Sequence, residues 1–289
     1  MDFTTLNNGN KMPQLGFGVF QIPVAETKQA VRDAIKAGYR SIDTARIYGN
    51  EAETGAAINE AVAAGEVARE DIFLTTKLFI QDFDDAKAAA AIDDSLQNAG
   101  QDYFDLILLH QPYGDVYGAW RALAEAQAAG KVKNIGISNF YPAKFIEFVN
   151  VVEQAGLPKP QINQVEFHPF YQEKVAREWH AKYGVQMEAW GPFAEGQHDI
   201  FTNPVLSEIA EKHEVAVAQV ILNWVMQAGI VAVAKSTKPE RMAQNIDIWD
   251  FTLDAEDLAK IETLDTNTPD FDHLDPNRVN WFYNVRSRG

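Results

Sequence analysis

The sequence predicts a closed barrel of eight parallel strands, each followed by a helix, as one domain spanning residues 1–289. Short apolar segments with β-branched residues alternate with Ala-rich amphipathic segments as far as about residue 247. The strand segments are continuous apolar runs, which is typical of parallel strands buried on both faces. No Pro/Gly/Ser-rich linker separates the units, and 289 residues with 46% hydrophobic composition suffice for one large core. An open doubly wound sheet is the alternative.

The chain opens with a β-hairpin, in which Phe3–Leu6 and Lys11–Pro13 flank the turn Asn7–Asn10. Eight strands are then expected at Leu15–Val19, Arg40–Thr44, Phe73–Leu78, Phe104–His110, Val132–Ser138, Gln161–Phe167, Gln186–Trp190 and Ile230–Lys235.

Helices are expected at Glu26–Ala37, Glu51–Ala63, Asp84–Ala99, Tyr117–Ala129, Pro142–Gln154, Gln172–Tyr183, Pro204–Gln227 (broken near His213) and Pro239–Ile246. Many of these helices are followed by glycine, the residue that most easily takes the left-handed conformation at a helix end. Beyond them we expect one more helix at Asp254–Leu264 and an irregular C-terminal tail from Asn267 to Gly289.

Composition excludes several classes of protein. A formal net charge of −16 argues against nucleic-acid binding, because such surfaces are usually basic. No segment approaches the roughly 18 uninterrupted apolar residues of a membrane span, and the N-terminus lacks the pattern of a secretory signal. The chain has no cysteine, so thiolate nucleophiles and zinc–thiolate sites are excluded. We therefore expect a cytoplasmic protein without nucleic-acid or membrane partners.

Four polar residues lie at or just past the ends of three consecutive strands. Asp43 ends one strand, Tyr48 lies in the loop after it, and Lys77 and His110 each close an apolar run. The C-terminal strand ends of such a barrel share one face, and that face carries the active site. The sequence therefore predicts that an acid, a phenol, an amine and an imidazole meet in one pocket.

These groups favour protonation of an oxygen on which negative charge develops, as when hydride is delivered to a carbonyl carbon. A tyrosine has an ordinary pKa of about 10, and a nearby ammonium such as Lys77 lowers it. Asp43 is expected to keep Lys77 charged and oriented, while His110 orients or donates to the substrate oxygen. No activated serine or thiol is evident. The scattered histidines give no metal-binding pattern, so we expect no metal site.

Hydride transfer requires a nicotinamide cofactor, yet Gly16-Phe17-Gly18 lacks the third glycine of the dinucleotide-binding fingerprint. A basic cluster follows the eighth strand instead, in Lys235-Ser236-Thr237-Lys238 and at Arg241, one turn into a helix. Barrels often bind phosphate at this position. The cluster therefore suits the 2′-phosphate of NADP.

Several motifs together resemble those of the aldo-keto reductase family, over nearly the whole chain and in sequential order. The matching segments are Gly38–Ala45 with Tyr48, Thr75–Leu78, Leu109–Pro112, Ile135–Phe140, Asn163–Pro169 and Ala234–Thr237. Within the family, the chain most resembles the bacterial 2,5-diketo-gluconate reductase and glyoxal reductase group. The resemblance implies a (β/α)8 barrel that reduces aldehydes and ketones with NADPH, and a monomer.

The resemblance also implies residue roles. Tyr48 would be the proton donor, tuned by Lys77 and Asp43, and His110 would orient the carbonyl. The cofactor would be held at the nicotinamide by Ser138, Asn139, Gln164 and the stacked Trp190, at the 2′-phosphate by Lys235, Ser236, Thr237 and Arg241, and at the adenine by Asn245. The family binds its cofactor extended across the barrel mouth, in agreement with the missing glycines.

Three positions depart from commoner family patterns. Gln111 and Phe79 stand where many members have tryptophan, and Gln244 stands where glutamate is usual. The first two alter the substrate pocket, for which we also name Phe20 and, from the tail, Trp281. The tail aromatics either shape this pocket or attach the tail to the helices.

Each of these residues, taken singly, also has a structural explanation. His168-Pro169 we interpret as structural, because Pro169 marks a strand exit and no catalytic partner is evident. The contrasting function for the whole chain is non-catalytic NADPH binding, as in the potassium-channel β-subunits and lens crystallins that share this fold. The joint occurrence of the motifs in one order favours a reductase that acts on a small carbonyl substrate.

Overall fold

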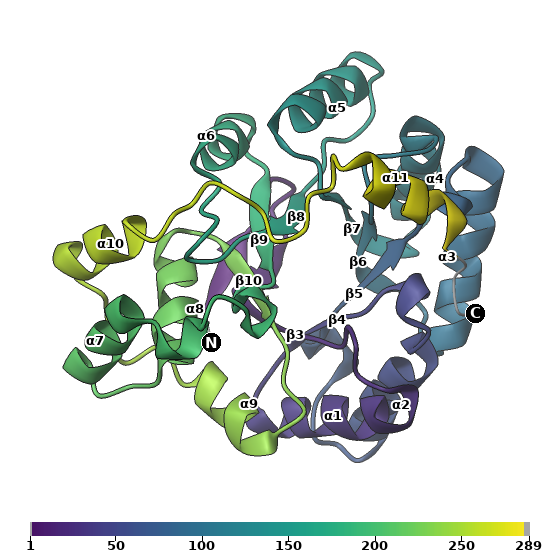
Figure 1. Ribbon diagram of the computed structural model, residues 1–289. Helices are drawn as coiled ribbons and strands as arrows, with labels where there is room; N and C mark the ends of the chain where they lie inside the picture. Colours follow the sequence, from purple (N-terminus) through teal and green to yellow (C-terminus); the bar gives the residue numbers. More distant parts are fainter. Residues whose placement is uncertain (1, 286–289) are drawn as a thin grey trace.

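The computed structural model, which describes residues 2–285, contains a closed barrel of eight parallel strands, as predicted (Figure 1). The barrel strands are β3 (Leu15–Gly18), β4 (Ser41–Asp43), β5 (Phe73–Leu78), β6 (Phe104–Leu109), β7 (Val132–Ser138), β8 (Ile162–Glu166), β9 (Gln186–Trp190) and β10 (Val231–Ala234). Each strand pairs with its sequence neighbours, and β10 closes the barrel against β3. The open-sheet alternative is therefore excluded.

The helices form a ring around the barrel (Figure 1). They are α1 (Val24–Ala37), α2 (Glu51–Ala63), α3 (Asp85–Ala99), α4 (Val116–Ala128), α5 (Pro142–Gln154), α6 (Lys174–Tyr183), α7 (Pro204–Lys212), α8 (Val217–Gln227), α9 (Pro239–Ile246) and α10 (Ala255–Glu262). Short 3-10 helices lie at η1 (Arg46–Tyr48), η2 (Arg69–Asp71), η3 (Ile80–Asp82), η4 (Ala194–Gly196) and η5 (Ile200–Thr202). The expected break near His213 separates α7 from α8.

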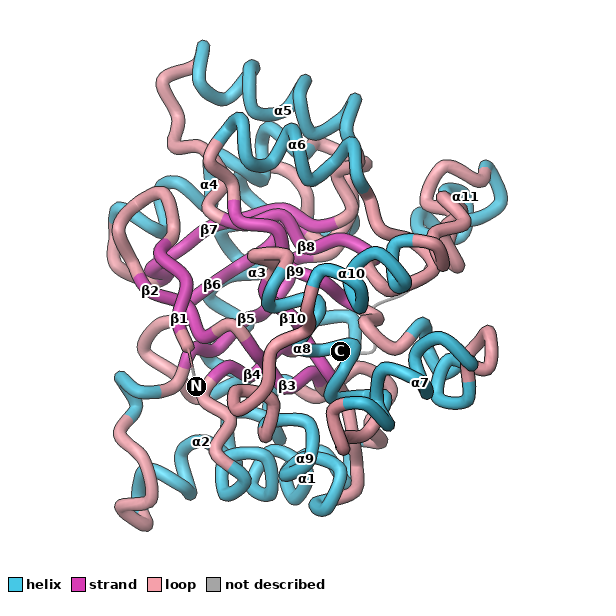
Figure 2. Tube along the Cα trace, turned by 90° about the vertical axis from the view of Figure 1, so that its left-hand side faces the viewer, coloured by secondary structure: helices cyan, strands magenta, loops and turns pink. Residues whose placement is uncertain are grey.

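The N-terminal hairpin has strands β1 (Phe3–Thr5) and β2 (Lys11–Pro13), which pair antiparallel. In Figure 2 the hairpin and α11 (Pro276–Asn284) lie at opposite sides of the molecule. Leu6 and Met12 from the hairpin segment pack with Phe73, Leu106 and other barrel residues in a separate apolar cluster. The hairpin thus covers one end of the barrel with apolar side chains and leaves the other end for the site.

The expectation of an irregular C-terminal tail is wrong for residues 276–284, which form α11. Asp275 caps this helix by accepting a hydrogen bond from the backbone N–H of Asn277, and Pro276 takes its first position. Both are ordinary signals for the start of a helix. One face of α11 buries Phe282, which anchors the helix to the barrel. Residues 286–289 of the expected tail lie outside the described residues.

Close packing between α2 and α3 depends on one small residue. A Cβ atom built on Gly55 would lie 1.8 Å from the carbonyl oxygen of Ala99, which no real contact tolerates. The two helices can therefore pack this closely only because Gly55 has no side chain. Among residues 2–285, no helix combines the length and the apolar character that crossing a membrane requires.

Candidate active site

The structure brings Asp43, Tyr48, Lys77 and His110 together at the C-terminal ends of β4, β5 and β6. The Lys77 ammonium is fully buried, and its Nζ lies 2.5 Å from Asp43 Oδ1 and 3.4 Å from Tyr48 Oη. It also donates to the Thr44 carbonyl oxygen at 3.1 Å. A buried amine needs such partners, because an unpaired charge away from water is costly. Lys77 thus links the acid to the phenol.

Burial and the surrounding charges together decide the protonation states of Lys77 and Tyr48. Burial works to lower the pKa of Lys77, but the opposing attraction of Asp43 and Tyr48 raises that pKa above its usual value, so the amine stays charged. Burial raises the pKa of Tyr48 to about 12, and Lys77 only partly offsets this effect. The ammonium therefore acts in the expected direction, but the expected net lowering of the tyrosine pKa is outweighed by desolvation.

The His110 ring lies against Tyr48 at a centroid separation of 5.7 Å and against Phe79 at 5.5 Å. Burial, with the Lys77 charge as a second cause, holds the pKa of His110 well below its usual value, so the imidazole is neutral at pH 7. Its Nδ1 is buried without a hydrogen-bond partner among the described residues. Phe20, half exposed, packs against Tyr48 at a centroid separation of 4.9 Å. Aromatic surfaces therefore border the phenol and the imidazole.

Ser138, Gln164 and Trp190 lie on the neighbouring strands β7, β8 and β9, and Asn139 directly follows β7. Hydrogen bonds connect these residues. Ser138 Oγ donates to the Gln164 carbonyl oxygen, and Asn139 Nδ2 donates to the His110 carbonyl oxygen, both at 2.9 Å. Trp190 Nε1 donates to Asn139 Oδ1 at 2.8 Å. Asn139 has a left-handed backbone with φ of 65°, which asparagine tolerates better than most residues. These side chains are held in place beside His110.

The basic cluster lies where the sequence predicts it. Lys235 and Thr237 follow β10 and are exposed, and Arg241 is exposed in the first turn of α9. Among residues 2–285, no carboxylate forms an ion pair with Lys235, Lys238 or Arg241. In a chain of net charge −16, these cations remain available to an anionic ligand. Asn245, the expected adenine contact, is buried at the end of α9.

The residues expected in the substrate pocket differ in their environment. Phe79 and Gln111 are buried, and Gln111 Oε1 has no hydrogen-bond partner among the described residues. Trp281 is half exposed on α11, whereas its neighbour Phe282 is buried and packs against Phe79 at 6.3 Å. Phe282 is therefore the residue of α11 that packs against Phe79, whose ring in turn contacts His110.

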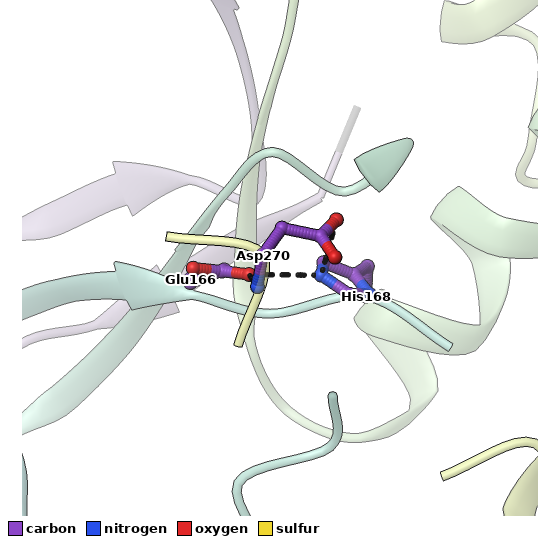
Figure 3. Close-up of side chains that lie close together, drawn as sticks. All are labelled: Glu166, His168 and Asp270. Atoms are coloured by element: carbon purple, nitrogen blue, oxygen red, sulfur yellow. Dashed lines mark hydrogen bonds and ion pairs between the residues drawn. The ribbon is translucent and has the colours of Figure 1, made fainter. Parts of the chain in front are cut away.

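A buried junction fastens the C-terminal segment to the end of β8. Figure 3 shows the side chains of Glu166, His168 and Asp270 close together, with His168 Nε2 at 3.1 Å from Glu166 Oε1 and 3.4 Å from Asp270 Oδ2. Glu166 also accepts the backbone N–H groups of Asp270 and Phe271. His168 therefore has two carboxylate partners that the sequence does not indicate, and the junction holds the segment that leads to α11.

Sequence reasoning missed two buried residues beside the site. Glu188, a carboxylate in the middle of the apolar strand β9, accepts a hydrogen bond from Gln164 Nε2 at 2.9 Å. Its position between Met187 and Ala189 was a signal that could have identified it. His273 packs against Trp190 at 6.0 Å, and burial lowers its pKa to about 4. No local pattern in the tail indicates His273.

Comparisons with known proteins show what the whole chain is similar to. A family model described as "Aldo/keto reductase family" matches residues 14–266. The chain is 44% identical to the glyoxal reductase of Bacillus subtilis (strain 168), over 91% of this chain and 92% of that protein. It is 38% identical to the methylglyoxal reductase DkgA of Escherichia coli (strain K12), over 90% and 92% of the two chains. Its structure resembles that of MGS-M4, an aldo-keto reductase from a Medee basin deep-sea metagenome library, with a TM-score of 0.89, 37% identity and coverage of 95% and 99%.

Proposed function

The chain belongs to the aldo/keto reductase family, and on this premise we propose that it reduces small aldehydes, dicarbonyls or keto-sugars to alcohols with NADPH. The observation that carries the proposal is the buried contact of one ammonium, Lys77, with both Asp43 and Tyr48, beside a neutral His110. The similarity to glyoxal and methylglyoxal reductases supports dicarbonyls as substrates.

The residues present fit a nicotinamide cofactor. Gln164 Oε1 accepts no hydrogen bond within residues 2–285, so it can accept one from the carboxamide of the nicotinamide. Ser138 Oγ and one remaining N–H of Asn139 complete a set of polar groups on the same side of the barrel. Trp190 supplies an aromatic face for the ring, and Lys235, Ser236, Thr237 and Arg241 supply donors for the 2′-phosphate. Asn245 is the proposed adenine contact.

When bound, NADPH supplies the hydride that the carbonyl carbon accepts. Tyr48 donates its hydroxyl proton to the carbonyl oxygen as negative charge develops there. Lys77 stabilises the resulting phenolate, and Asp43 keeps Lys77 charged and directed at Tyr48. His110, neutral at pH 7, orients the carbonyl by donating one ring N–H. The aromatic rings of Phe20 and Phe79 limit water around the reacting oxygen, with Gln111 and Trp281 as further proposed pocket residues.

The test is the loss of NADPH absorbance with methylglyoxal, a 2,5-diketo-sugar and an aromatic aldehyde, with NADH in parallel. We expect turnover, with NADPH preferred, and none by the Tyr48→Phe variant, which should still bind NADPH. Tight NADPH binding without turnover of any carbonyl would instead favour the non-catalytic binding protein. Equal use of NADH and NADPH would contradict the proposed 2′-phosphate site. A monomeric state and a cytoplasmic location stay predictions.

A further inference from the structure

Beside Gln164 lies a buried carboxyl group, Glu188, that takes no part in the proposed reaction. Glu188 is buried in β9, and its Oε2 accepts one N–H of the Gln164 amide at 2.9 Å. The other N–H of the same amide group donates to Asp43 Oδ2 at 2.9 Å. Asp43 in turn holds Lys77 through its second oxygen. A continuous chain of buried polar groups therefore runs from Glu188 to the ammonium beside Tyr48.

Two acceptors on one amide nitrogen decide which way the amide faces. Asp43 Oδ2 and Glu188 Oε2 each accept one N–H of the Gln164 amide, so Nε2 points inward and Oε1 is left for a ligand. With a single acceptor, the amide would have more freedom to rotate or flip. Glu188 thus restricts Gln164 to the orientation that accepts a hydrogen bond from the nicotinamide carboxamide.

We propose that Glu188 is a positioning residue that orients Gln164 toward the nicotinamide and whose ionisation shifts the binding preference between reduced and oxidised cofactor. The inference rests on the proposed function, because it requires that Gln164 contacts the nicotinamide.

The charge of Glu188 changes with pH. Burial, with Asp43 as the second cause, raises the pKa of Glu188 to about 8, so the group is mostly neutral at pH 7 and ionises as the pH rises through 8. Ionisation places a second negative charge next to Asp43, and the Lys77 ammonium opposes the two. A negative charge at the floor of the site favours the cationic ring of NADP+ over the neutral ring of NADPH.

The neighbouring elements provide no competing titration between pH 7 and 9. On β8, Gln164 does not titrate, and on β10 the residue paired with Glu188 is the apolar Val231. Across the barrel, Lys77 and Tyr48 have pKa values raised above their usual values, and that of His110 lies well below. Asp43 completes the charged groups that act on Glu188.

Three variants separate the two effects. Glu188→Gln keeps a side-chain carbonyl that can accept from Gln164 but cannot ionise. Glu188→Leu removes the acceptor at similar volume. Arg241→Ala is the matched control on the other half of the cofactor. The readouts are the dissociation constants of NADPH, NADH and NADP+ at pH 7 and 9, measured by quenching of protein fluorescence, with circular dichroism to confirm folding.

At pH 7, Glu188→Leu should weaken NADPH and NADH about fivefold or more and by similar factors, whereas Arg241→Ala should weaken NADPH alone. Between pH 7 and 9, the ratio of the NADP+ to the NADPH dissociation constant should fall severalfold in the parent protein and stay constant in Glu188→Gln. The ratio cancels the titration of the 2′-phosphate, which both cofactors share. These measurements need no turnover, so they distinguish failure of this proposal from failure of the reductase function.

Two results would overturn the proposal. A folded Glu188→Leu protein that binds NADPH and NADH as tightly as the parent would exclude a role in orienting Gln164. A pH-dependent ratio that persists unchanged in Glu188→Gln would assign the titration to another group.

Discussion

Replacement of Lys77 by methionine removes the ammonium from the site while keeping the length and much of the volume of the side chain. Lys77 Nζ lies 3.4 Å from Tyr48 Oη. At an effective dielectric constant of about 20, unit charges at this distance attract by about 5 kcal/mol. The phenolate carries between half and all of its charge in the transition state, so the loss is about 2.5–5 kcal/mol. At about 1.4 kcal/mol per factor of ten, we expect reduction to slow on the order of 10²- to 10⁴-fold.

The assay is a single turnover of enzyme-bound NADPH with methylglyoxal, followed by absorbance in stopped flow. Lys77→Met leaves the Asp43 carboxylate buried without its ion-pair partner, which destabilises a protein by about 3–5 kcal/mol. Circular dichroism and the dissociation constant of NADPH must therefore show that the variant is folded and binds cofactor. The double variant Lys77→Met with Asp43→Asn is the control, because it removes both charges and should regain stability without regaining turnover.

Two outcomes would refute this reasoning. A folded Lys77→Met protein that reduces methylglyoxal within tenfold of the parent rate would show that the ammonium does not stabilise the phenolate. Recovery of turnover in the double variant would show that the loss came from the unpaired Asp43 carboxylate and not from Tyr48.

Arg241→Ala should raise the KM for NADPH by about 10- to 100-fold, the effect of about 1.5–3 kcal/mol for hydrogen bonds to a charged group, and leave the KM for NADH nearly unchanged; an equal rise for both would exclude contact with the 2′-phosphate. Gly55→Ala should lower the midpoint of thermal unfolding, because its Cβ would lie 1.8 Å from the Ala99 carbonyl oxygen. Helix propensity alone predicts that alanine stabilises the helix by about 1 kcal/mol relative to glycine. An increase in the unfolding midpoint would therefore disprove the contact between α2 and α3. The pKa of Glu188 is higher in the folded protein, about 8, than the ordinary carboxyl value of 4.5. Between these two pH values the unfolded chain releases the proton and the folded protein keeps it. The free energy of unfolding of the parent therefore falls as the pH rises from 4.5 toward about 8. Glu188→Gln should remove this loss of stability, which amounts to a few kcal/mol at about 1.4 kcal/mol per pKa unit. The measurement is the midpoint of thermal unfolding of both proteins at pH 5 and pH 8. If the midpoint changes equally in the two proteins, Glu188 is not buried as a neutral acid.

Most of the barrel can be predicted from local patterns. Phe73–Leu78, Val132–Ser138 and Gln186–Trp190 have the strand bounds that the apolar runs predict, and Pro239–Ile246 has the expected helix bounds. The error at α11 also has a local cause, because Asp275-Pro276 is a helix-start signal set in an otherwise polar stretch of sequence. Closure of the barrel then places Asp43, Lys77 and His110 on one face without further information.

The sequence by itself determined the barrel, the strand ends that carry the four polar groups, and the basic cluster at Lys235 and Arg241. Only the tertiary structure decided which of these groups touch and how they titrate. Gln164 meets Asp43 across 121 positions of sequence, and Glu166 holds the backbone of Asp270 across 104. Such contacts leave no local pattern, because they depend on how strands and loops distant in sequence meet at the barrel mouth. The same holds for the pKa of Tyr48, where burial outweighs the ammonium, since desolvation is a property of the whole surrounding fold.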